Sequence, residues 1–551
     1  MRRRVDHVLS SEANQVFSAP PSISQVQRVT DNRSAGQVVP IIDLFAGPGG
    51  LGEGFSSFVP AKGRSGFKIA LSIEKDATAH QTLELRAFFR TAKRADIRSA
   101  YYRFIRGELT RTELFSAFPK EASSARSEAW CQELAEASHN RVTRRVARAL
   151  QGSEISILIG GPPCQAYSLV GRSRNAGNPH YSERDDKRHT LYQEYLRVLS
   201  KQLPSVFVME NVKGLLSATY NEQRTLDRIL SDLQDPLTAL GRKRGIKKEQ
   251  RYTILALGTC DEQYDAFDAP RIGLSQYVVK CEEHGIPQSR HRVILIGVRE
   301  DFLRAKRLIL PRSPAPTTGD FLGGMPGLRS GITGVDDSSE AWLKTISSAL
   351  NEAWYDSLKR SDSAVAEKID GAVTRATRLR RERGAEFFPA EISRDEEGSP
   401  YHDAMLGGLA NHSARSHMPE DLKRYLFASA FAAVHHRSPT LPDFPKSLLP
   451  DHRNVASALS GGLFADRFRV QTRDRPSTTI TSHIAKDGHY YIHYDPSQCR
   501  SLTVREAARL QTFPDNYFFC GPRTAQYHQV GNAVPPMLAR QIARAISDYL
   551  G

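Results

Sequence analysis

The sequence has few cysteines and no long apolar run, and each absence excludes a class of protein. Its 551 residues contain only six cysteines, and no two are spaced as Cys-x-x-Cys. A disulfide-stabilised scaffold and a cysteine-rich zinc site therefore have no support, and a reducing cytoplasm suits the chain. No stretch approaches about 18 consecutive apolar residues, which argues against a membrane-spanning helix. The charged N-terminus also lacks the apolar run of a secretory signal.

Acidic residues are fewer than basic ones, and this imbalance is the first positive signal. Lys and Arg number 76 against 61 Asp and Glu, which gives a net charge of +15. Such an excess favours a polyanionic partner, most often nucleic acid, although a basic protein without such a partner stays open on charge alone. Residues 306–470 contain 22 basic and 21 acidic residues, so the excess lies elsewhere in the chain.

Apolar runs alternate with helical patterns over much of the chain after a polar start. Residues 1–38 are rich in Ser, Gln and Arg, so we expect a flexible N-terminal arm. Short apolar runs bounded by Gly and Pro then alternate with helical stretches, which predicts an α/β domain with a parallel sheet and crossover helices. These runs cover residues 38–45, 67–73, 155–159, 206–209 and 293–298.

Two stretches interrupt this pattern. Residues 98–150 are longer than a crossover needs and carry arginines at helical spacing. They predict a helical insertion with a basic face, which either a nucleic-acid contact or a solvated surface would explain. Residues 306–470 lose the strand–helix rhythm, and we expect a second, smaller domain there. The α/β pattern then resumes, which predicts one domain from residues 39–305 and 471–551, with helices over 503–511 and 536–550.

A glycine-rich loop follows the first apolar run. Residues 43–52 read DLFAGPGGLG, and Gly47, Gly49 and Gly52 satisfy G-x-G-x-x-G. Such glycines let the backbone turn tightly and approach a dinucleotide or S-adenosylmethionine. Glu74 ends the second run, where a carboxylate can accept hydrogen bonds from ribose hydroxyls. We expect Asp96 to follow a third strand, where it could accept from an adenine amino group; a helix cap or a surface charge is the alternative for both acids.

Three further groups are expected at the same edge of the sheet. Cys164 follows an apolar run and two prolines that stiffen its approach, as a thiolate nucleophile requires. Glu210 follows the neighbouring run and could act as a general acid. Arg290 and Arg292 would point the same way in an extended segment and suit a polar, anionic substrate, although a phosphate or surface contact explains Arg-x-Arg equally well.

Taken together, these pieces closely resemble the DNA (cytosine-5)-methyltransferases of bacterial type. The resemblance covers roughly residues 40–300 and 470–551, in the family's order. Residues 98–150 and 235–276 are longer than in compact members, and residues 306–470 match no readable sequence specificity. The matching pieces are DLFAGPGG at 43–50, Glu74, Asp96, GGPPCQAYS at 160–168, ENVKG at 210–214, QSRHR at 288–292, RPSTTIT at 475–481, LTVREAARLQTFPD at 502–515 and QVGNAVPP at 529–536.

The resemblance implies a methyltransferase that uses S-adenosylmethionine and no metal. Its fold would be a Rossmann-like, doubly wound sheet with a target-recognition domain at 306–470. It would methylate carbon 5 of a flipped-out cytosine in specific DNA sequences through a covalent adduct with Cys164. Glu210 would assist protonation at ring N3, Arg292 would contact the base O2, and Arg290 would support the pocket or a phosphate.

The resemblance also assigns residues to the cofactor and to the DNA. Residues 165–190 look like a mobile lid that closes on DNA, with a disordered loop as the alternative. For Leu191 and Val534, ordinary core packing is nearly as good an explanation as a cofactor contact. The cofactor residues carried over are Phe45, Gly47, Gly49, Glu74, Asp96, Pro163, Leu191, Asn532 and Val534.

Three alternatives stay open beside this interpretation. Transfer-RNA methyltransferases of the same fold carry Cys-Phe-Thr in the recognition region, and no cysteine lies between Cys281 and Cys499 here. A catalytically silent DNA-binding relative should have lost Cys164 or Glu210. A nicotinamide enzyme would not need all these motifs together.

The partners expected from the resemblance are double-stranded DNA and a cognate restriction endonuclease or phage-defence partner. We expect a monomer in the cytoplasm, associated with the nucleoid and not with a membrane. In the recognition region His412, Arg415, His417 and Tyr425 attract attention, although helix caps and packing explain them as well.

Overall fold

The computed structural model describes residues 36–163, 188–220, 223–241, 250–258, 273–390, 401–451, 455, 459 and 465–551. The expected nucleophile Cys164, most of the expected lid and nearly all of the expected N-terminal arm lie outside these residues. So does part of the long stretch 235–276. The other residues expected at a catalytic or cofactor site are all described.

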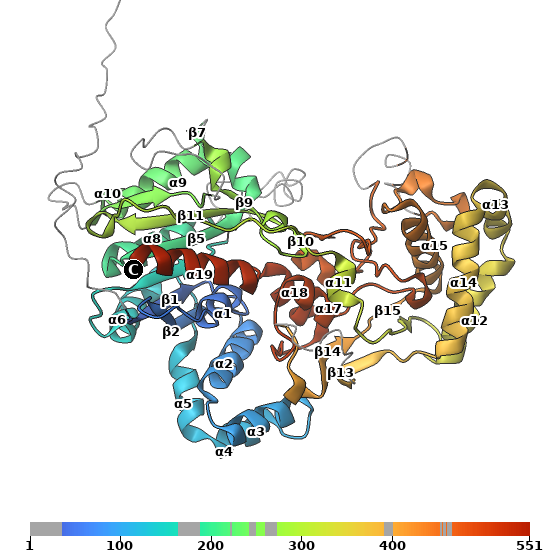
Figure 1. Cartoon of the computed structure of the whole chain (residues 1–551), viewed down its shortest axis with the longest axis horizontal. Helices are drawn as coiled ribbons and strands as arrows, with labels where there is room; N and C mark the ends of the chain where they lie inside the picture. Colours follow the sequence, from blue (N-terminus) through green and yellow to red (C-terminus); the bar gives the residue numbers. More distant parts are fainter. Residues whose placement is uncertain are drawn as a thin grey trace, which may run out of the picture.

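A single mixed sheet forms the centre of the larger part of the molecule (Figure 1). Within the described residues its order is β3-β2-β1-β4-β5-β11-β8, and β9 pairs with β11 beside this path. The five expected apolar runs are confirmed as strands, and the α/β class is confirmed with them. The strands are β1 (Val38–Leu44), β2 (Gly66–Glu74), β3 (Ala129–Cys131), β4 (Ile157–Gly160), β5 (Val206–Val212), β8 (Tyr252–Leu255), β9 (Val278–Lys280) and β11 (His291–Arg299).

The sequence pattern predicts a parallel sheet, but the observed sheet is mixed. Strands β3, β2, β1, β4 and β5 are parallel, but β11 runs antiparallel to β5, β8 and β9. An apolar run shows that a strand is buried but does not show its direction, and this is why the expectation was wrong for β11. The reversal places the start of β11 beside the end of β5.

Both faces of the sheet are covered, which explains why its strands read as continuous apolar runs. Ile157 and Ile159 of β4 belong to the core on one face, and Leu158 between them belongs to the core on the other. Helices α1 (Gly50–Ser56) and α19 (Pro536–Leu550) cover the first face. The second face is covered by α6 (His139–Leu150), α8 (Arg188–Gln202) and α9 (Thr225–Gln234), with α10 (Pro236–Ala239) and the hairpin of β6 (Thr219–Tyr220) and β7 (Gln223–Arg224) nearby (Figure 1).

The expected C-terminal helices are confirmed and return to the sheet. Helix α17 (Val504–Leu510) begins with a capping box in which Thr503 and Glu506 bond reciprocally, followed by α18 (Arg523–Asn532) and α19. Gly54 lets α19 approach α1, because a Cβ there would lie 2.4 Å from the carbonyl oxygen of Pro536. Helix α19 therefore packs closely against α1, the helix that follows the glycine loop.

The long stretch after β2 is mostly helical, but a strand interrupts it. Its helices pack together and also contact Leu406 and Ala410 of the recognition region. The insertion thus reaches from the sheet to the recognition region (Figure 1). The whole stretch from β2 to β4 consists of α2 (Ala77–Thr91), α3 (Ala95–Ile105), α4 (Arg111–Ala117) and α5 (Pro119–Glu128), followed by β3 and α6.

Residues 306–470 fold mainly around helices with a core of their own. The chain enters and leaves this region side by side, since the amide of Thr318 donates to the carbonyl oxygen of Arg475 at 2.7 Å. The elements of this part are α11 (Thr318–Leu322), β12 (Gly331–Ile332), α12 (Ser339–Ser348), α13 (Ala353–Ser361), α14 (Ser363–Leu379), β13 (Gly384–Pro389), β14 (Gly408–Ser413), β15 (Ser416–His417) and α15 (Pro419–His435). Short strands β10 (Gln288–Ser289) and β16 (Ser477–Thr478) pair outside the main sheet.

Candidate active site

One edge of the sheet collects the polar groups that the sequence singles out. The parallel strands β4 and β5 end there, and Pro162 and Pro163 follow β4. Because β11 is antiparallel, it begins where β5 ends, and Arg292 lies opposite Val212 in the ladder. The reversal of β11 therefore brings Arg292 to Glu210, which a parallel strand would not do.

Glu210 and Arg292 form an ion pair at this edge. Nε of Arg292 lies 2.8 Å from Oε1 of Glu210, and the two side chains are only 11% and 13% exposed. Arg292 Nη1 also donates to the carbonyl oxygen of His291 at 2.8 Å, which fixes the guanidinium plane. The other carboxylate oxygen lies beside Gly161, where a Cβ would come within 2.9 Å of Oε2. Gly161 thus leaves room for the Glu210 carboxyl group.

Asn211 ties the end of β5 to the proline loop. Its Nδ2 donates to the carbonyl oxygen of Pro162 at 3.5 Å, and its Oδ1 accepts from the amide of Val212 at 2.8 Å. Pro163 is half-buried, and the next residue in the chain is Cys164. The segment that leads to the expected nucleophile is thus anchored beside Glu210. No role for Asn211 was assigned from the sequence, although Glu-Asn-Val is one of its recognisable pieces.

Arg290 lies in the interior beside the site, and its contacts differ from those of Arg292. It is 2% exposed, and its Nη1 and Nη2 donate to the carbonyl oxygens of Ile480 and Ala533 at 2.7 and 2.9 Å. Burial and the neighbouring Arg292 lower its pKa to about 9. With both nitrogens bonded inside the protein, Arg290 fits a supporting role and not a phosphate contact.

Gln288 adds to this support, although no role was predicted for it. Its Nε2 donates to the carbonyl oxygen of Leu510 at 3.1 Å, and its Oε1 accepts from the amide of Ile480 at 2.9 Å. Gln288 and Arg290 together join the start of β11 to the segments that return from the recognition region. The position of Gln288 just before the Arg-x-Arg segment was the only sequence signal for this supporting role.

The glycine loop lies at the other end of the edge and is shaped by its backbone. Phe45, Gly47 and Gly49 have φ values of 55°, 57° and 96°, in the left-handed region. Gly47 donates its amide to Oε2 of Glu74 at 2.9 Å, and Asp76 donates to Oε1 at 2.8 Å. A Cβ on Gly47 would meet nothing within 4 Å. This open cradle beside a carboxylate with spare acceptor capacity fits the adenosyl part of S-adenosylmethionine.

The C-terminal motif closes against this loop. A Cβ on Gly50 would lie 2.2 Å from the carbonyl oxygen of Val534, so these two backbones touch. Val534 is buried in the core, whereas Asn532 is exposed at the end of α18. Tyr517, which the sequence did not single out, donates its hydroxyl to the carbonyl oxygen of Pro48. Gly50, Val534 and Tyr517 thus hold the loop in place.

Leu191 and Asp96 do not join this cluster in the described contacts. Leu191 is half-buried in the first turn of α8. The placement expected for Asp96 is wrong, because no strand ends there. Asp96 lies in the first turn of α3, 51% exposed and paired with Arg94 at 2.5 Å.

The strand beside Glu74 is β3, and it comes later in the chain than expected. Its last residue Cys131 lies opposite Glu74, and the amide of Gln132 donates to the carbonyl oxygen of Glu74 at 2.9 Å. The three residues Ala-Trp-Cys are too short to show as an apolar run, and helical arginines surround them. The sequence pattern therefore hides this strand end and points to Asp96 instead.

Asp43 lies buried under the loop, and no role was predicted for it. Burial, with the neighbouring carboxylate of Glu74, raises its pKa to about 8 against the lowering effect of Arg90. The raised pKa favours the neutral form of the Asp43 carboxyl group. A neutral group at this position avoids a second negative charge below Glu74.

Buried packing explains the polar cluster of the recognition region. His412, His417 and Tyr425 are fully buried or nearly so, and Tyr425 bonds to Nδ1 of His489 at 2.7 Å. Arg415 donates to the carbonyl oxygens of Ile484 and Lys486 at 2.5 Å. These side chains hold residues 306–470 to the returning chain through buried contacts.

In the part of the chain that the structure describes, no group of three or more His, Cys, Asp or Glu residues could hold a metal ion. No helix there has the length and apolar character needed to cross a membrane.

Comparison with known proteins identifies relatives of this chain. The profile of the C-5 cytosine-specific DNA methylase family matches residues 100–236 and 266–548. The type II methyltransferase M.Bpa9945I of Bacillus paralicheniformis is 32% identical over 531 residues, covering 93% of this chain and 99% of the relative. The DNA (cytosine-5-)-methyltransferase M.ApeKI of Aeropyrum pernix is 26% identical, covering 73% of this chain and 83% of the relative.

Among solved structures, a putative DNA modification methyltransferase encoded in an E. coli prophage covers 93% of this chain and 99% of its own, with a TM-score of 0.44 and 18% identity. The resemblance drawn from the motifs is confirmed by the family profile and by the relatives. The chain therefore belongs to the C-5 cytosine-specific DNA methylase family and is a DNA (cytosine-5)-methyltransferase.

Proposed function

We propose that this enzyme methylates carbon 5 of a flipped-out cytosine in specific sequences of double-stranded DNA, through a covalent adduct with Cys164. The observation that carries this proposal is the Glu210–Arg292 ion pair, held beside the proline loop that leads to Cys164. Residues 39–305 and 471–551 would supply the chemistry, and residues 306–470 would recognise the target.

The chemical difficulty explains these residue types. Carbon 5 of cytosine is a poor nucleophile until a group adds to carbon 6. The Cys164 thiolate would form a bond to carbon 6, and the displaced electron pair would be stabilised by a proton placed on ring N3 with the help of Glu210. Arg292 holds Glu210 in position and would meet the base O2. Carbon 5, made enamine-like by this addition, would bond to the methyl group that the cofactor supplies. Loss of the carbon 5 proton would then expel Cys164, and loss of the N3 proton would restore the neutral ring of 5-methylcytosine.

The cofactor site would be formed by the glycine loop. S-adenosylmethionine supplies an electrophilic methyl group when it is bound. Glu74 would accept from its ribose hydroxyls, while Phe45, Gly47 and Gly49 would line the cradle. Pro163, Leu191, Asn532 and Val534 remain proposals for the same site. Asp96 is proposed no longer, because it lies on a different element.

The base must leave the helix to reach this edge. Carbon 6 is hidden inside a stacked duplex, and flipping the nucleotide costs a few kcal/mol. Residues 165–190, mostly outside the described residues, are proposed as the segment that closes over the flipped base. A monomer suffices for one flipped base, and we propose that the enzyme acts as one in the cytoplasm.

The biological setting is proposed from the relatives. M.Bpa9945I and M.DdeI of Desulfomicrobium norvegicum are both type II methyltransferases. We therefore propose a role in restriction–modification or phage defence, with a cognate endonuclease as partner.

Labelled S-adenosylmethionine tests the proposal. Wild type, Cys164→Ala and Glu210→Gln are each incubated with duplex DNA or transfer RNA, and the digested nucleosides are separated. We expect labelled 5-methylcytosine in DNA from wild type, none from Cys164→Ala, and bisulfite sequencing to locate the target site. Label in transfer RNA alone would contradict the proposal and favour the RNA enzyme.

A further inference from the structure

The basic face of α6 is an unassigned surface at the end of the sheet. Arg141, Arg144, Arg145 and Arg148 recur at helical spacing and form one stripe. The opposite side of the helix is buried through Val142, Val146 and Leu150. The stripe therefore has a fixed backing, and its arginines extend from a rigid element.

These arginines differ from those of the preceding helices in their partners. In α2 to α5 and their caps most arginines are matched by carboxylates: Arg111 and Arg126 pair with Glu84, and Arg103 and Arg106 pair with Glu108. In the described structure, none of the four α6 arginines has a carboxylate within 4.0 Å. The positive charge of α6 is thus available to an external anion.

The contacts that these arginines do make leave their charge in place. Arg141 and Arg145 lie over the ring of Trp130, at 5.9 and 5.5 Å from its centre. Arg145 also donates to the carbonyl oxygen of Ser127 at 2.9 Å, and Arg144 to that of Asn140 at 3.2 Å. Aromatic and carbonyl contacts orient a guanidinium without neutralising it.

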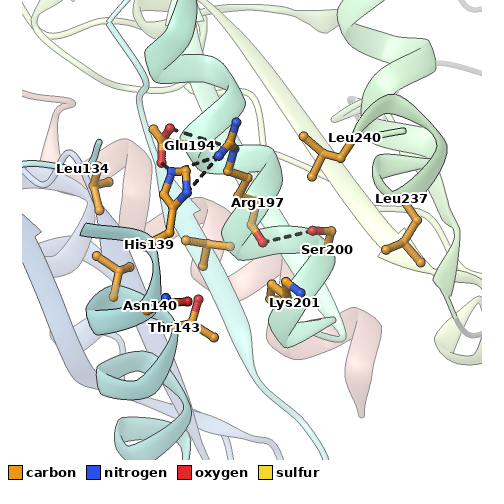
Figure 2. A pocket seen from close by; sticks show the side chains of 12 residues that line it. Leu134, His139, Asn140, Thr143, Glu194, Arg197, Ser200, Lys201, Leu237 and Leu240 are labelled. Atoms are coloured by element: carbon orange, nitrogen blue, oxygen red, sulfur yellow. Dashed lines mark hydrogen bonds and ion pairs between the residues drawn. The ribbon is translucent and has the colours of Figure 1, made fainter. Parts of the chain in front are cut away.

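Helix α8 extends this surface with one more cation. Lys201 is exposed and lies with Asn140 and Thr143 of α6 around one pocket (Figure 2). In the same pocket His139 pairs with Glu194 at 2.6 Å, and Arg197 lies 2.8 Å from Nδ1 of His139. Lys201 has no ion pair of this kind within the described residues, so it adds a charge to the α6 stripe.

We infer that Arg144, Arg148 and Lys201 bind the phosphate backbone of duplex DNA outside the target site, as a second, sequence-independent contact surface. The inference rests on the proposed DNA substrate. A rise of about 1.5 Å per residue spreads the stripe over about 10 Å, which spans about three phosphates of one strand. Helix α6 lies at the opposite end of the long axis from α12, α13 and α14 of the recognition region (Figure 1). The near-neutral charge of residues 306–470 leaves phosphate binding to other parts of the chain.

The salt dependence of DNA binding tests this inference. The double variant Arg144→Gln/Arg148→Gln is compared with the control Arg103→Gln/Arg106→Gln, which removes the same charge from arginines that Glu108 already pairs. Affinity is measured over a salt series on a long duplex and on a short duplex limited to the target site. On the long duplex the α6 variant should lower the slope of log K against log salt by about 2, or about 0.9 per phosphate contact.

The short duplex, the control variant and a methylation assay distinguish failure of this inference from failure of the proposed function. We expect the short duplex to give the wild-type slope with the α6 variant, and the control to match wild type on both duplexes. A wild-type slope for the α6 variant on the long duplex, or an equal loss in the control, would overturn the inference. If wild type methylates no DNA at all, the proposed function fails instead. Melting temperatures check that both variants are folded.

Discussion

The two ends of the proposed catalytic edge are built in different ways. At the end proposed to hold the cofactor, the cofactor end, backbone torsions shape the glycine loop, and Glu74 accepts amide hydrogens from Gly47 and Asp76. At the end proposed to hold the base, the base end, a nearly buried ion pair between Glu210 and Arg292 shapes the site. The first end should therefore respond to an added Cβ and the second to a change of charge. Substitutions confined to one end, and one substitution that affects both ends, test whether the two ends are independent.

The largest effect is expected at the base end from Glu210→Gln. The amide keeps the size of the carboxyl group but cannot supply the proton, so kcat should fall about 10²- to 10⁴-fold. Cofactor affinity should stay unchanged, since the glycine loop contributes no charge to this pair. Steady-state methylation and equilibrium binding of S-adenosylmethionine measure the two effects. A parallel loss of cofactor affinity would show that the two ends are not separate.

Arg290→Met should disturb both ends at once. It leaves the buried carbonyl oxygen of Ile480 without this donor and that of Ala533 with only the longer bond from Gln511 Nε2 at 3.4 Å. An unpaired buried group costs about 1–3 kcal/mol. Denaturant unfolding should show this loss, together with weaker cofactor binding because Ala533 precedes Val534. The control Arg64→Met removes an exposed pair with Asp548 at 3.8 Å and should cost under about 1 kcal/mol. An equal loss of unfolding free energy in the two variants would contradict the supporting role of Arg290.

Gly49→Ala should affect the cofactor end alone. Its φ of 96° is unfavourable for alanine, and the added Cβ would lie 2.7 Å from Cδ2 of Leu83. Strain of about 1–3 kcal/mol corresponds to a loss of roughly tenfold or more in cofactor affinity. Gly152→Ala is the matched control, since Gly152 also has a positive φ of 71° but nothing within 4 Å. Unchanged cofactor affinity in Gly49→Ala would contradict a backbone-shaped cradle.

Asp43 should give the free energy of unfolding a pH dependence. Its folded pKa of about 8 lies above the ordinary value of 3.8. The stability it contributes is therefore fully present below pH 3.8 and is lost as the pH rises towards 8, by at most about 1.4 kcal/mol per pH unit. Asp43→Asn should remove this part of the slope in denaturant unfolding between pH 5 and 8. Identical slopes in the two proteins would show that Asp43 is ionised in the folded state.

Much of the catalytic edge could be predicted from the sequence, because buried strands read as apolar runs and the polar groups follow them directly. Glu74 lies against the glycine loop as the spacing suggested, and Glu210 and Arg292 meet. Two features lay beyond this reasoning. The direction of β11 is not encoded in its apolar run, and β3 is too short to be read, which misplaced Asp96.

Arg290 shows a finer limit of sequence reasoning. Alternation in one extended strand would direct Arg290 and Arg292 to the same side. In the structure β10 ends at Ser289 and β11 begins at His291, so Arg290 lies at a break between the strands and faces inward. The interior of the recognition region was equally hidden, since buried histidines such as His412 and His417 give no periodic signal.

The central claim is that Cys164 bonds to carbon 6 of the target cytosine. A duplex in which fluorine replaces the hydrogen at carbon 5 of that cytosine tests it directly, because the final proton loss cannot then occur and the adduct is trapped. We expect a complex that survives denaturation, with the modified peptide containing Cys164, and no complex with Cys164→Ser. Normal methylation of the unmodified duplex without a trapped adduct, or an adduct on another residue, would contradict the account.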